Sequence, residues 1–326
     1  MTEVLQADRD GIARAAALLR TGALIAFATE TVYGLGADAT NDSAVAAVFV
    51  AKHRPRFNPL ICHYPDSDIA LVDVVASAKA RCLAAAFWPG PLTLVLPRSD
   101  RCPVSLLASA GLDTLAVRVP AHDVARTLLR EVDRPVAAPS ANRSGRVSPT
   151  TAQHVLAELG GAIDAILDCG PSDVGVESTV LDLCSEQPRL LRAGGTTLEA
   201  IEAVIGPVQQ HTAPSGAIRS PGMLASHYAP TLPVRMQATA IQANEALLAF
   251  GPPLPGAPLV FSLSDGADLT EAASRLFTAL RLLDEQAMAL GLTRIAAMPV
   301  PDYGIGRAIN DRLRRASAPR PLRADP

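Results

Sequence analysis

Short apolar runs alternate along the chain with segments in which apolar residues recur at helical spacing. Short runs bounded by glycine, proline or asparagine are typical of buried strands, and recurrence every three or four residues is typical of amphipathic helices. Up to residue 205, this pattern predicts strands at 23–27, 60–63, 92–96, 115–119, 136–138, 165–168, 179–182 and 189–192. It predicts helices at 8–20, 41–53, 67–86, 121–131, 151–159 and 198–204. Such alternation indicates an α/β fold with an open, twisted, mixed sheet.

A proline- and glycine-rich stretch without apolar periodicity, residues 206–230, follows this domain and is predicted to be a linker. The alternation then resumes, with strands predicted at 232–236, 259–263 and 294–298. The predicted helices are at 243–250, 269–290 and 306–316. We therefore expect a first domain at 1–205, a smaller Rossmann-like α/β unit at 231–316 and a frayed tail at 317–326.

The composition is that of a globular protein without a strongly charged surface. Of the 326 residues, 49% are hydrophobic and 19% are charged, and the formal net charge is -3. This balance argues against non-specific nucleic-acid binding, which requires a basic field. The five cysteines contain no CxxC pair, so neither a disulfide framework nor a zinc ribbon is predicted. No apolar run is long enough to cross a bilayer, and we expect a cytoplasmic protein with no membrane partner.

Hydroxyl, acidic and glycine residues follow the first predicted strand, in the stretch FATETVYGLGADA at 27–39. Ligands of α/β proteins bind beyond the carboxyl ends of strands, where we expect Thr29, Glu30 and Thr31 to lie. An ordinary strand-to-helix turn capped by a hydroxyl explains the same residues equally well.

Three cationic side chains stand where a positive charge needs a partner. Lys52 and Arg54 precede a proline-broken loop and could cradle polyphosphate, although a helix end also favours cations through its dipole. Arg118 interrupts an otherwise apolar strand, and a buried charge is costly unless it is paired. Its expected partner is either a bound carboxylate or phosphate, or an acidic side chain in a structural salt bridge.

Polar loops that contain glycine supply further candidate ligands. The loop PSANRSGRVSPTT at 139–151 suits a nucleotide, but it is not a Walker loop and capping turns use the same residue types. The stretches GVESTVL and LRAGG place Ser178 and Arg192 at strand ends. In the linker, the segment SPGMLASHYAP at 220–230 carries large side chains, which favours a lid over a simple spacer.

Seven segments, in this order, resemble the Sua5/YrdC/YwlC family of threonylcarbamoyl-AMP synthases: TETVYGLGADA, KHRPRFNPLICH, WPGPLTLVL, VRVPAH, APSANRSGRVSPT, GVESTVLDL and LLRAGG. The linker segment and the second α/β unit are similar to those of the longer Sua5 type, so the resemblance covers nearly the whole chain. It implies a YrdC-like open, twisted sheet with a central, positively lined cavity, and a smaller C-terminal Sua5 domain.

The resemblance also implies an activity. A nucleotidyltransferase of this family joins L-threonine, bicarbonate and ATP into L-threonylcarbamoyladenylate, with Mg²⁺ accompanying ATP and pyrophosphate released. No tightly bound cofactor is expected. A separate transfer complex would then modify an adenosine beside the anticodon of certain tRNAs, so direct nucleic-acid binding by this chain is expected to be weak or absent. No covalent protein intermediate is needed, and no residue stands out as a general base for the threonine amine.

Site residues follow from the resemblance position by position. Threonine binding falls on Thr31, His63, Arg118, Ala138 and Ser178. ATP binding falls on Lys52, Arg54, Asn58, Thr114, Ser140, Asn142, Ser148, Arg192 and Tyr228. Lys52, Arg54 and Arg118, together with Arg192, are expected to stabilise charge during catalysis, and no metal-binding residue is assigned. The chain departs from the family pattern in the linker, at Leu224, Ala225 and Ser226.

Two other interpretations remain. A non-catalytic RNA-binding module is disfavoured by the acidic net charge and by the lack of a basic stripe interleaved with aromatic residues. A carbamoyltransferase of the kind found in hydrogenase maturation would contain acylphosphatase-like and zinc-finger regions, and this chain has no cysteine spacing to supply the latter.

Overall fold

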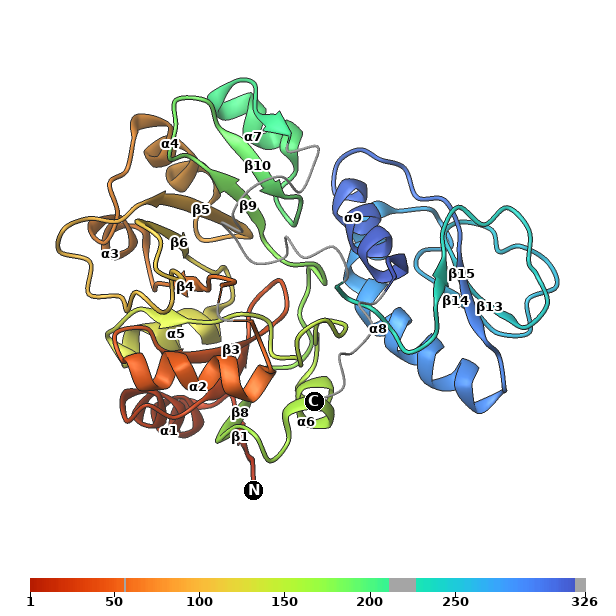
Figure 1. Cartoon of the computed structure of the whole chain (residues 1–326), viewed down its shortest axis with the longest axis horizontal. Coiled ribbons are helices and arrows are strands. Elements are labelled where there is room, and N and C mark those ends of the chain that lie inside the picture. The colour runs from red at the N-terminus through yellow and green to blue at the C-terminus, as the bar shows by residue number, and fades with distance from the viewer. Residues whose placement is uncertain (56, 211–226, 320–326) are drawn as a thin grey trace. The chain divides into compact units, whose positions relative to one another are not determined.

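A computed structural model of the chain describes residues 1–55, 57–210 and 227–319 (Figure 1). These residues form two compact units, one with residues 1–144 and 148–210 and the other with residues 145–147 and 227–319. The centre of the predicted linker, including most of the candidate lid, and the end of the predicted tail lie outside the described residues.

One mixed sheet of eleven strands forms the frame of the first unit. The strands are β1 (Glu3–Gln6), β2 (Ile25–Ala28), β3 (Tyr33–Asp38), β4 (Ile61–His63), β5 (Leu92–Pro97), β6 (Thr114–Arg118), β7 (Val136–Ala137), β8 (Ala165–Asp168), β9 (Thr179–Asp182), β10 (Arg189–Arg192) and β11 (Gln209–Gln210). Across the sheet they follow the order β1-β8-β2-β3-β7-β4-β6-β5-β9-β10-β11. Neighbours run parallel in some pairs, such as β4 with β6, and antiparallel in others, such as β5 with β6. The predicted mixed α/β sheet is therefore confirmed.

Helices cover both faces of this sheet. Those described in the first unit are α1 (Arg9–Arg20), α2 (Asp42–Lys52), α3 (Ser67–Val72), α4 (Ala78–Phe87), α5 (Asp123–Val132), α6 (Ala152–Leu159) and α7 (Leu198–Ile205). The side chains of β2 alternate between two apolar clusters, as the pleat of a strand requires. Ile25 and Phe27 join the cluster that contains α1 and α5, whereas Ala26 and Ala28 join the cluster that contains α2 and α4. Because both faces are covered, polar side chains gather where strands end.

The second unit has a smaller, parallel sheet. Its described strands are β12 (Val234–Arg235), β13 (Glu245–Ala249), β14 (Val260–Ser262) and β15 (Arg294–Ala297), in the order β12-β15-β13-β14. Two helices, α8 (Leu269–Ala289) and α9 (Gly306–Ser317), pack against each other and against strands of this sheet. Parallel strands with helical connections agree with the predicted Rossmann-like unit. Within the described residues, no helix combines the length and the apolar composition that a membrane span requires.

The single helix predicted at 67–86 is wrong, because the chain leaves the helix between α3 and α4. There Asp73 accepts a hydrogen bond from the hydroxyl of Tyr64 at 2.7 Å, and Val74 forms an isolated bridge to the strand region beyond β5. Ser77 then caps α4 by accepting from a backbone N–H of its first turn at 3.3 Å. Local side-chain bonds therefore split an apparently continuous periodic pattern.

The helix predicted at 243–250 is also wrong, because these residues form strand β13. All five residues of β13 are buried, and the strand lies between β15 and β14. A short apolar run that is buried on both faces has no polar side to reveal its period, so helix and strand cannot be distinguished by pattern alone.

The glycines of the stretch at 27–39, for which a strand-to-helix turn was one interpretation, lie in strand β3. It pairs antiparallel with β2, so that Gly36 stands opposite Ile25. A Cβ atom on Gly36 would lie 2.8 Å from Cε1 of Phe27, which shows that glycine allows the close packing here. Strand β1 was not predicted, because just one of its four residues is buried and its pattern is weak.

Candidate active site

The turn between β2 and β3 is closed by the hydroxyl of Thr29. This hydroxyl donates to the backbone oxygen of Val32 at 2.8 Å and lies 2.7 Å from Oγ1 of Thr31. Thr29, Glu30 and Thr31 are all buried although they are polar. The sequence therefore encodes a hydroxyl-capped turn, and that turn also carries a set of buried polar groups.

Arg118, at the end of β6, brings this turn together with the centre of the sheet. Its Nη2 atom donates to Oε1 of Glu30 at 2.6 Å, and its Nη1 atom donates to Oγ1 of Thr31 at 2.9 Å. A third bond joins its Nε atom to the backbone oxygen of Gly90 at 3.3 Å. The buried charge predicted from the sequence thus has a carboxylate partner from the chain itself, and two predicted threonine-binding residues, Thr31 and Arg118, are in contact.

His63 ends β4 beside Arg118, because the two residues pair in the register of β4 and β6. The imidazole is buried, and its Nδ1 atom lies 3.2 Å from the backbone oxygen of Ile61. Burial, and secondarily the positive charge of Arg118, lower the pKa of His63 to about 3. His63 is therefore neutral at neutral pH. We call Glu30, Thr31, His63 and Arg118 the Arg118 cluster.

Ser178 and Arg192 form a second group of contacts at the β9–β10 hairpin. The Nη2 atom of Arg192 donates to the backbone oxygen of Ser178 at 2.9 Å and to its Oγ atom at 3.1 Å. That Oγ atom also lies 2.8 Å from Oγ1 of Thr93 on β5. Since Leu94 pairs with Val117 between β5 and β6, Thr93 occupies the position next to Arg118 in the sheet. Ser178 is therefore linked to the Arg118 cluster through one intervening threonine.

Thr93 was missed by sequence reasoning, although a single threonine within the apolar run LTLVL was a usable signal.

Glu177, next to Ser178, accepts a hydrogen bond from Oγ of Ser148 at 2.5 Å, so the predicted nucleotide loop reaches the same hairpin. Gly194 lies against this junction, and a Cβ atom there would stand 2.3 Å from the carbonyl carbon of Ser178. The first glycine of LRAGG, Gly194, is thus required by close approach of the backbone.

Lys52, the last residue of α2, is buried with 1% of its surface exposed, so the interpretation as a solvated helix end is wrong. Its Nζ atom donates to the backbone oxygens of Ser140 and Asn142. In return, the backbone N–H of Ser144 donates to the backbone oxygen of Lys52 at 2.9 Å. Burial, and secondarily the charge of Arg54, hold the pKa of Lys52 well below its usual range. Lys52 therefore fixes the backbone of the predicted nucleotide loop.

Arg54 and Asn58 are in contact within the proline-broken loop that follows α2. The guanidinium of Arg54 is buried and donates to the backbone oxygens of Asn58, at 3.2 Å, and Pro59, at 3.0 Å. The loop between α2 and β4 is thus folded around this side chain.

Three further predicted residues lie at separate places. Ala138 follows β7 directly, and its backbone N–H donates to the backbone oxygen of Ile61 at 2.9 Å, which places it opposite Ile61, two residues before His63 on β4. Thr114 begins β6, four residues before Arg118, or about 13 Å away along a strand. Tyr228 belongs to the second unit, where it stacks on Phe277 with ring centroids 5.4 Å apart.

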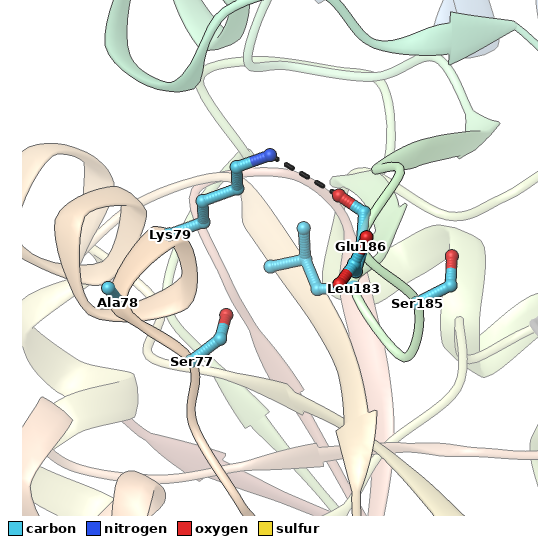
Figure 2. A pocket seen from close by; sticks show the side chains of 6 residues that line it. All are labelled: Ser77, Ala78, Lys79, Leu183, Ser185 and Glu186. Atoms are coloured by element: carbon cyan, nitrogen blue, oxygen red, sulfur yellow. Dashed lines mark hydrogen bonds between the residues drawn. The ribbon is translucent and has the colours of Figure 1, made fainter.

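A surface hollow of about 550 Å³ lies elsewhere on the first unit, between the start of α4 and the chain after β9 (Figure 2). Figure 2 shows Lys79 donating to the backbone oxygen of Glu186, at 3.3 Å. None of the predicted site residues lines this hollow.

Among the residues that the structure describes, no three His, Cys, Asp or Glu side chains are grouped so that they could hold a metal ion.

Comparisons with known proteins cover both units. The Sua5–YciO–YrdC family model, described as telomere recombination, matches residues 17–194, and a model described as the C-terminal domain of threonylcarbamoyl-AMP synthase matches residues 196–318. A threonylcarbamoyl-AMP synthase of Bacillus subtilis is 42% identical over 342 aligned positions, which cover 99% of this chain and 97% of the relative. One of Pyrococcus abyssi is 43% identical, with 93% of each chain covered.

Solved structures agree in fold. P. abyssi Sua5 complexed with L-threonine superposes with a TM-score of 0.87 at 41% identity, covering 97% of both chains. Full-length HypF, at 21% identity and a TM-score of 0.51, matches 57% of this chain and 29% of its own, which is a likeness of fold alone.

Proposed function

The chain belongs to the Sua5/YrdC family of threonylcarbamoyl-AMP synthases, and from this premise we propose that it joins L-threonine, bicarbonate and ATP into L-threonylcarbamoyladenylate with release of pyrophosphate. In chemical class the reaction is a nucleotidyl transfer, because AMP passes from ATP to a carbamate. The adenylate then serves a separate complex that places the threonylcarbamoyl group on tRNA.

The observation that carries this proposal is the convergence of the predicted threonine residues. Arg118 contacts Thr31, His63 pairs beside Arg118, and Ser178 is linked to them through Thr93. These residues come from segments far apart in the sequence, and nothing in their local elements requires them to meet. A guanidinium with hydroxyls and a neutral imidazole matches the carboxylate and hydroxyl of L-threonine.

The chemistry can proceed without a covalent protein intermediate. The amine of threonine forms a bond to the carbon of bicarbonate while the C–OH bond breaks and water leaves. An oxygen of the resulting carbamate then attacks the α-phosphorus of ATP while the bond to pyrophosphate breaks. The protein then acts by positioning the reactants and by stabilising negative charge. Arg54, Arg118 and Arg192 are buried cations suited to that role.

We assign Lys52 to positioning rather than to direct contact with phosphate. Its ammonium group donates to two carbonyl oxygens of the loop that carries Ser140, Asn142 and Ser148. A loop held in this way presents its remaining polar groups to the nucleotide in one conformation. Thr114 and Tyr228 remain predictions for ATP binding.

Mg²⁺ enters this reaction with ATP. The ion prefers phosphate oxygens and water together with one or two carboxylates, and seldom uses a cage built by protein alone. We therefore expect Mg²⁺ to arrive with the nucleotide, held by phosphate oxygens and water.

The test is pyrophosphate release from ATP by the purified protein with Mg²⁺, omitting L-threonine or bicarbonate in turn. Release that requires both substrates supports the proposal. Pyrophosphate release that does not require threonine would support a carbamoyl-transfer activity instead. The absence of pyrophosphate release under every condition would favour a binding module.

A further inference from the structure

Glu30 is a buried carboxylate, and the residues that the structure describes satisfy one of its two oxygens. Its side chain is 9% exposed, and Oε1 accepts the short bond from Arg118. The second oxygen, Oε2, has no hydrogen-bond partner among the described residues. Leaving a charged acceptor buried and unpaired is costly, and such groups are rare in folded proteins unless a ligand completes them.

This oxygen lies within the Arg118 cluster. The guanidinium that binds Glu30 through Nη2 also binds Thr31 through Nη1, so the two side chains flank one planar group. Because Arg118 and Thr31 are residues of the proposed threonine site, a ligand held by them comes within reach of Glu30.

The charges of the cluster match an amino acid as a whole. Arg118 contributes one positive charge and Glu30 one negative charge, while His63 is neutral because burial and Arg118 lower its pKa to about 3. A guanidinium has five N–H donors, three of which have partners in the described part of the chain, so two remain for a ligand. A zwitterion offers a carboxylate for these donors and an ammonium group for Oε2 of Glu30.

We propose that Glu30 binds the ammonium group of the amino-acid substrate and accepts the proton that this group must lose before it reacts. The inference rests on the proposed function, and it deepens that function by naming the group that recognises and activates the amine.

The step balances as follows in atoms and charge. The ammonium group gives one proton to Oε2 of Glu30, and the nitrogen lone pair then forms a bond to the carbon of bicarbonate. The C–OH bond of bicarbonate breaks, and the hydroxide leaves as water with a second proton from the nitrogen. The products are the carbamate, one water molecule and a protonated Glu30, which returns its proton to solvent before the next turnover.

The first measurement uses the unaltered full chain. Calorimetric titration compares L-threonine with 3-hydroxybutanoate, which retains the carboxylate and hydroxyl but lacks the amine. Because a charged hydrogen-bonded pair is lost, we expect the analogue to bind about 10- to 100-fold more weakly. Equal binding of the two molecules would overturn the proposal without any variant.

The second measurement uses Glu30→Gln, which can still accept from Arg118 but carries no charge and accepts no proton. We expect the affinity for L-threonine to fall about 10- to 100-fold, whereas the weak binding of 3-hydroxybutanoate stays as it is. Glu30→Asp, which keeps the charge, should recover part of the difference. Glu271→Gln, in an exposed Glu–Arg pair on α8, is the matched control and should behave as the wild type.

The pH dependence separates proton transfer from a structural role. At low threonine concentration, the rate of pyrophosphate release by Glu30→Gln should rise about tenfold per pH unit. Only the unprotonated amine can react in this variant, and its fraction rises about tenfold per pH unit while most of the amine is protonated. The wild type should depend on pH more weakly. A variant with lower activity but an unchanged pH profile, or one that loses affinity for both ligands equally, would overturn the proposal. If the wild type binds threonine but releases no pyrophosphate, the proposed function fails while the binding comparison still decides the role of Glu30.

Discussion

Lys52 illustrates how burial changes the role of a side chain. The sequence placed it at a helix end, where a solvated cation is common, yet the structure directs its ammonium group to two backbone oxygens of the loop at 139–151. A buried Nζ donor of this kind stabilises the loop by satisfying carbonyl groups that would otherwise be buried without partners.

Replacing Lys52 by methionine keeps an unbranched side chain but removes both bonds. We expect the protein to stay folded, with a loss of about 2 kcal/mol in stability, and the KM for ATP to rise at least about tenfold because the loop is no longer held. Steady-state kinetics with each substrate varied in turn measure this effect. The control is Lys79→Met, at the sequence's other lysine, whose exposed side chain makes one long bond to Glu186. Equal kinetics for the two variants would contradict the role assigned to Lys52.

His63 makes the stability of the first unit depend on pH. Its pKa of about 3 in the folded state lies below the value of about 6.5 in the unfolded chain, so the unfolded state binds the extra proton between these values. The free energy of unfolding therefore falls as the pH drops below about 6.5, by about 2 kcal/mol at pH 5, and His63 contributes no further change below pH 3. Urea unfolding of the wild type and of His63→Gln across this range measures the difference. Parallel pH dependences would show that His63 is not buried in its neutral form.

At the scale of elements, amphipathic helices and short apolar runs bounded by turn residues were predictable. Helices α1 and α5 have a polar face that reveals their period, whereas strands such as β2 and β5 are short apolar runs bounded by turn residues. Their predicted positions agree with the structure to within a few residues. A short run without a polar face can be assigned to either type of element, and β13, which is buried on both faces, was wrongly predicted to be a helix. The prediction was also wrong between α3 and α4, where Asp73 and Ser77 interrupt the helix through side-chain bonds that depend on tertiary partners.

Site prediction followed a different logic. The motif residues Thr31, His63, Arg118 and Ser178 were named from the resemblance, while their convergence depends on strand order, which the sequence pattern does not determine. The local sequence indicated that Arg118 needs a partner but could not identify Glu30, which is 88 residues away along the chain. Long-range pairing therefore accounts for what could not be predicted.

The hairpin of β9 and β10 depends on Gly194. Alanine at this position would place its Cβ 2.3 Å from backbone atoms of Ser178 and Thr179, so the entry to β9 must move. We expect Gly194→Ala to destabilise the protein by about 1–3 kcal/mol and to weaken threonine binding, because Ser178 shifts with its backbone. Thermal unfolding and calorimetric titration measure the two effects. Gly266→Ala, where no atom of the described residues lies within 4 Å of the added atom, is the control and should match the wild type.

At the scale of the whole molecule, the balance of charge bears on the order of events in tRNA modification. The net charge of -3 provides no basic field for a polyanion, and the cations of the candidate site are buried and bonded to the chain itself. Adenylate synthesis should therefore proceed on the free protein, before any tRNA is engaged.

Unmodified tRNA added to the reaction should leave the KM values for ATP and L-threonine unchanged. Retention of tRNA by the protein in filter binding should be weak near physiological salt, because few counterions would be released from the nucleic acid. Micromolar or tighter binding that falls steeply with salt, or a strong acceleration by tRNA, would contradict this prediction.

The burial of Lys52 allows local unfolding of the loop at 139–151 to be followed by limited proteolysis. The sequence contains two lysines, of which Lys79 is exposed and Lys52 is enclosed by the loop it anchors. A lysine-specific protease should cut first after Lys79, and a cut after Lys52 should appear when that loop has detached. The ratio of the two cleavage products therefore reports local unfolding of this loop without any added label.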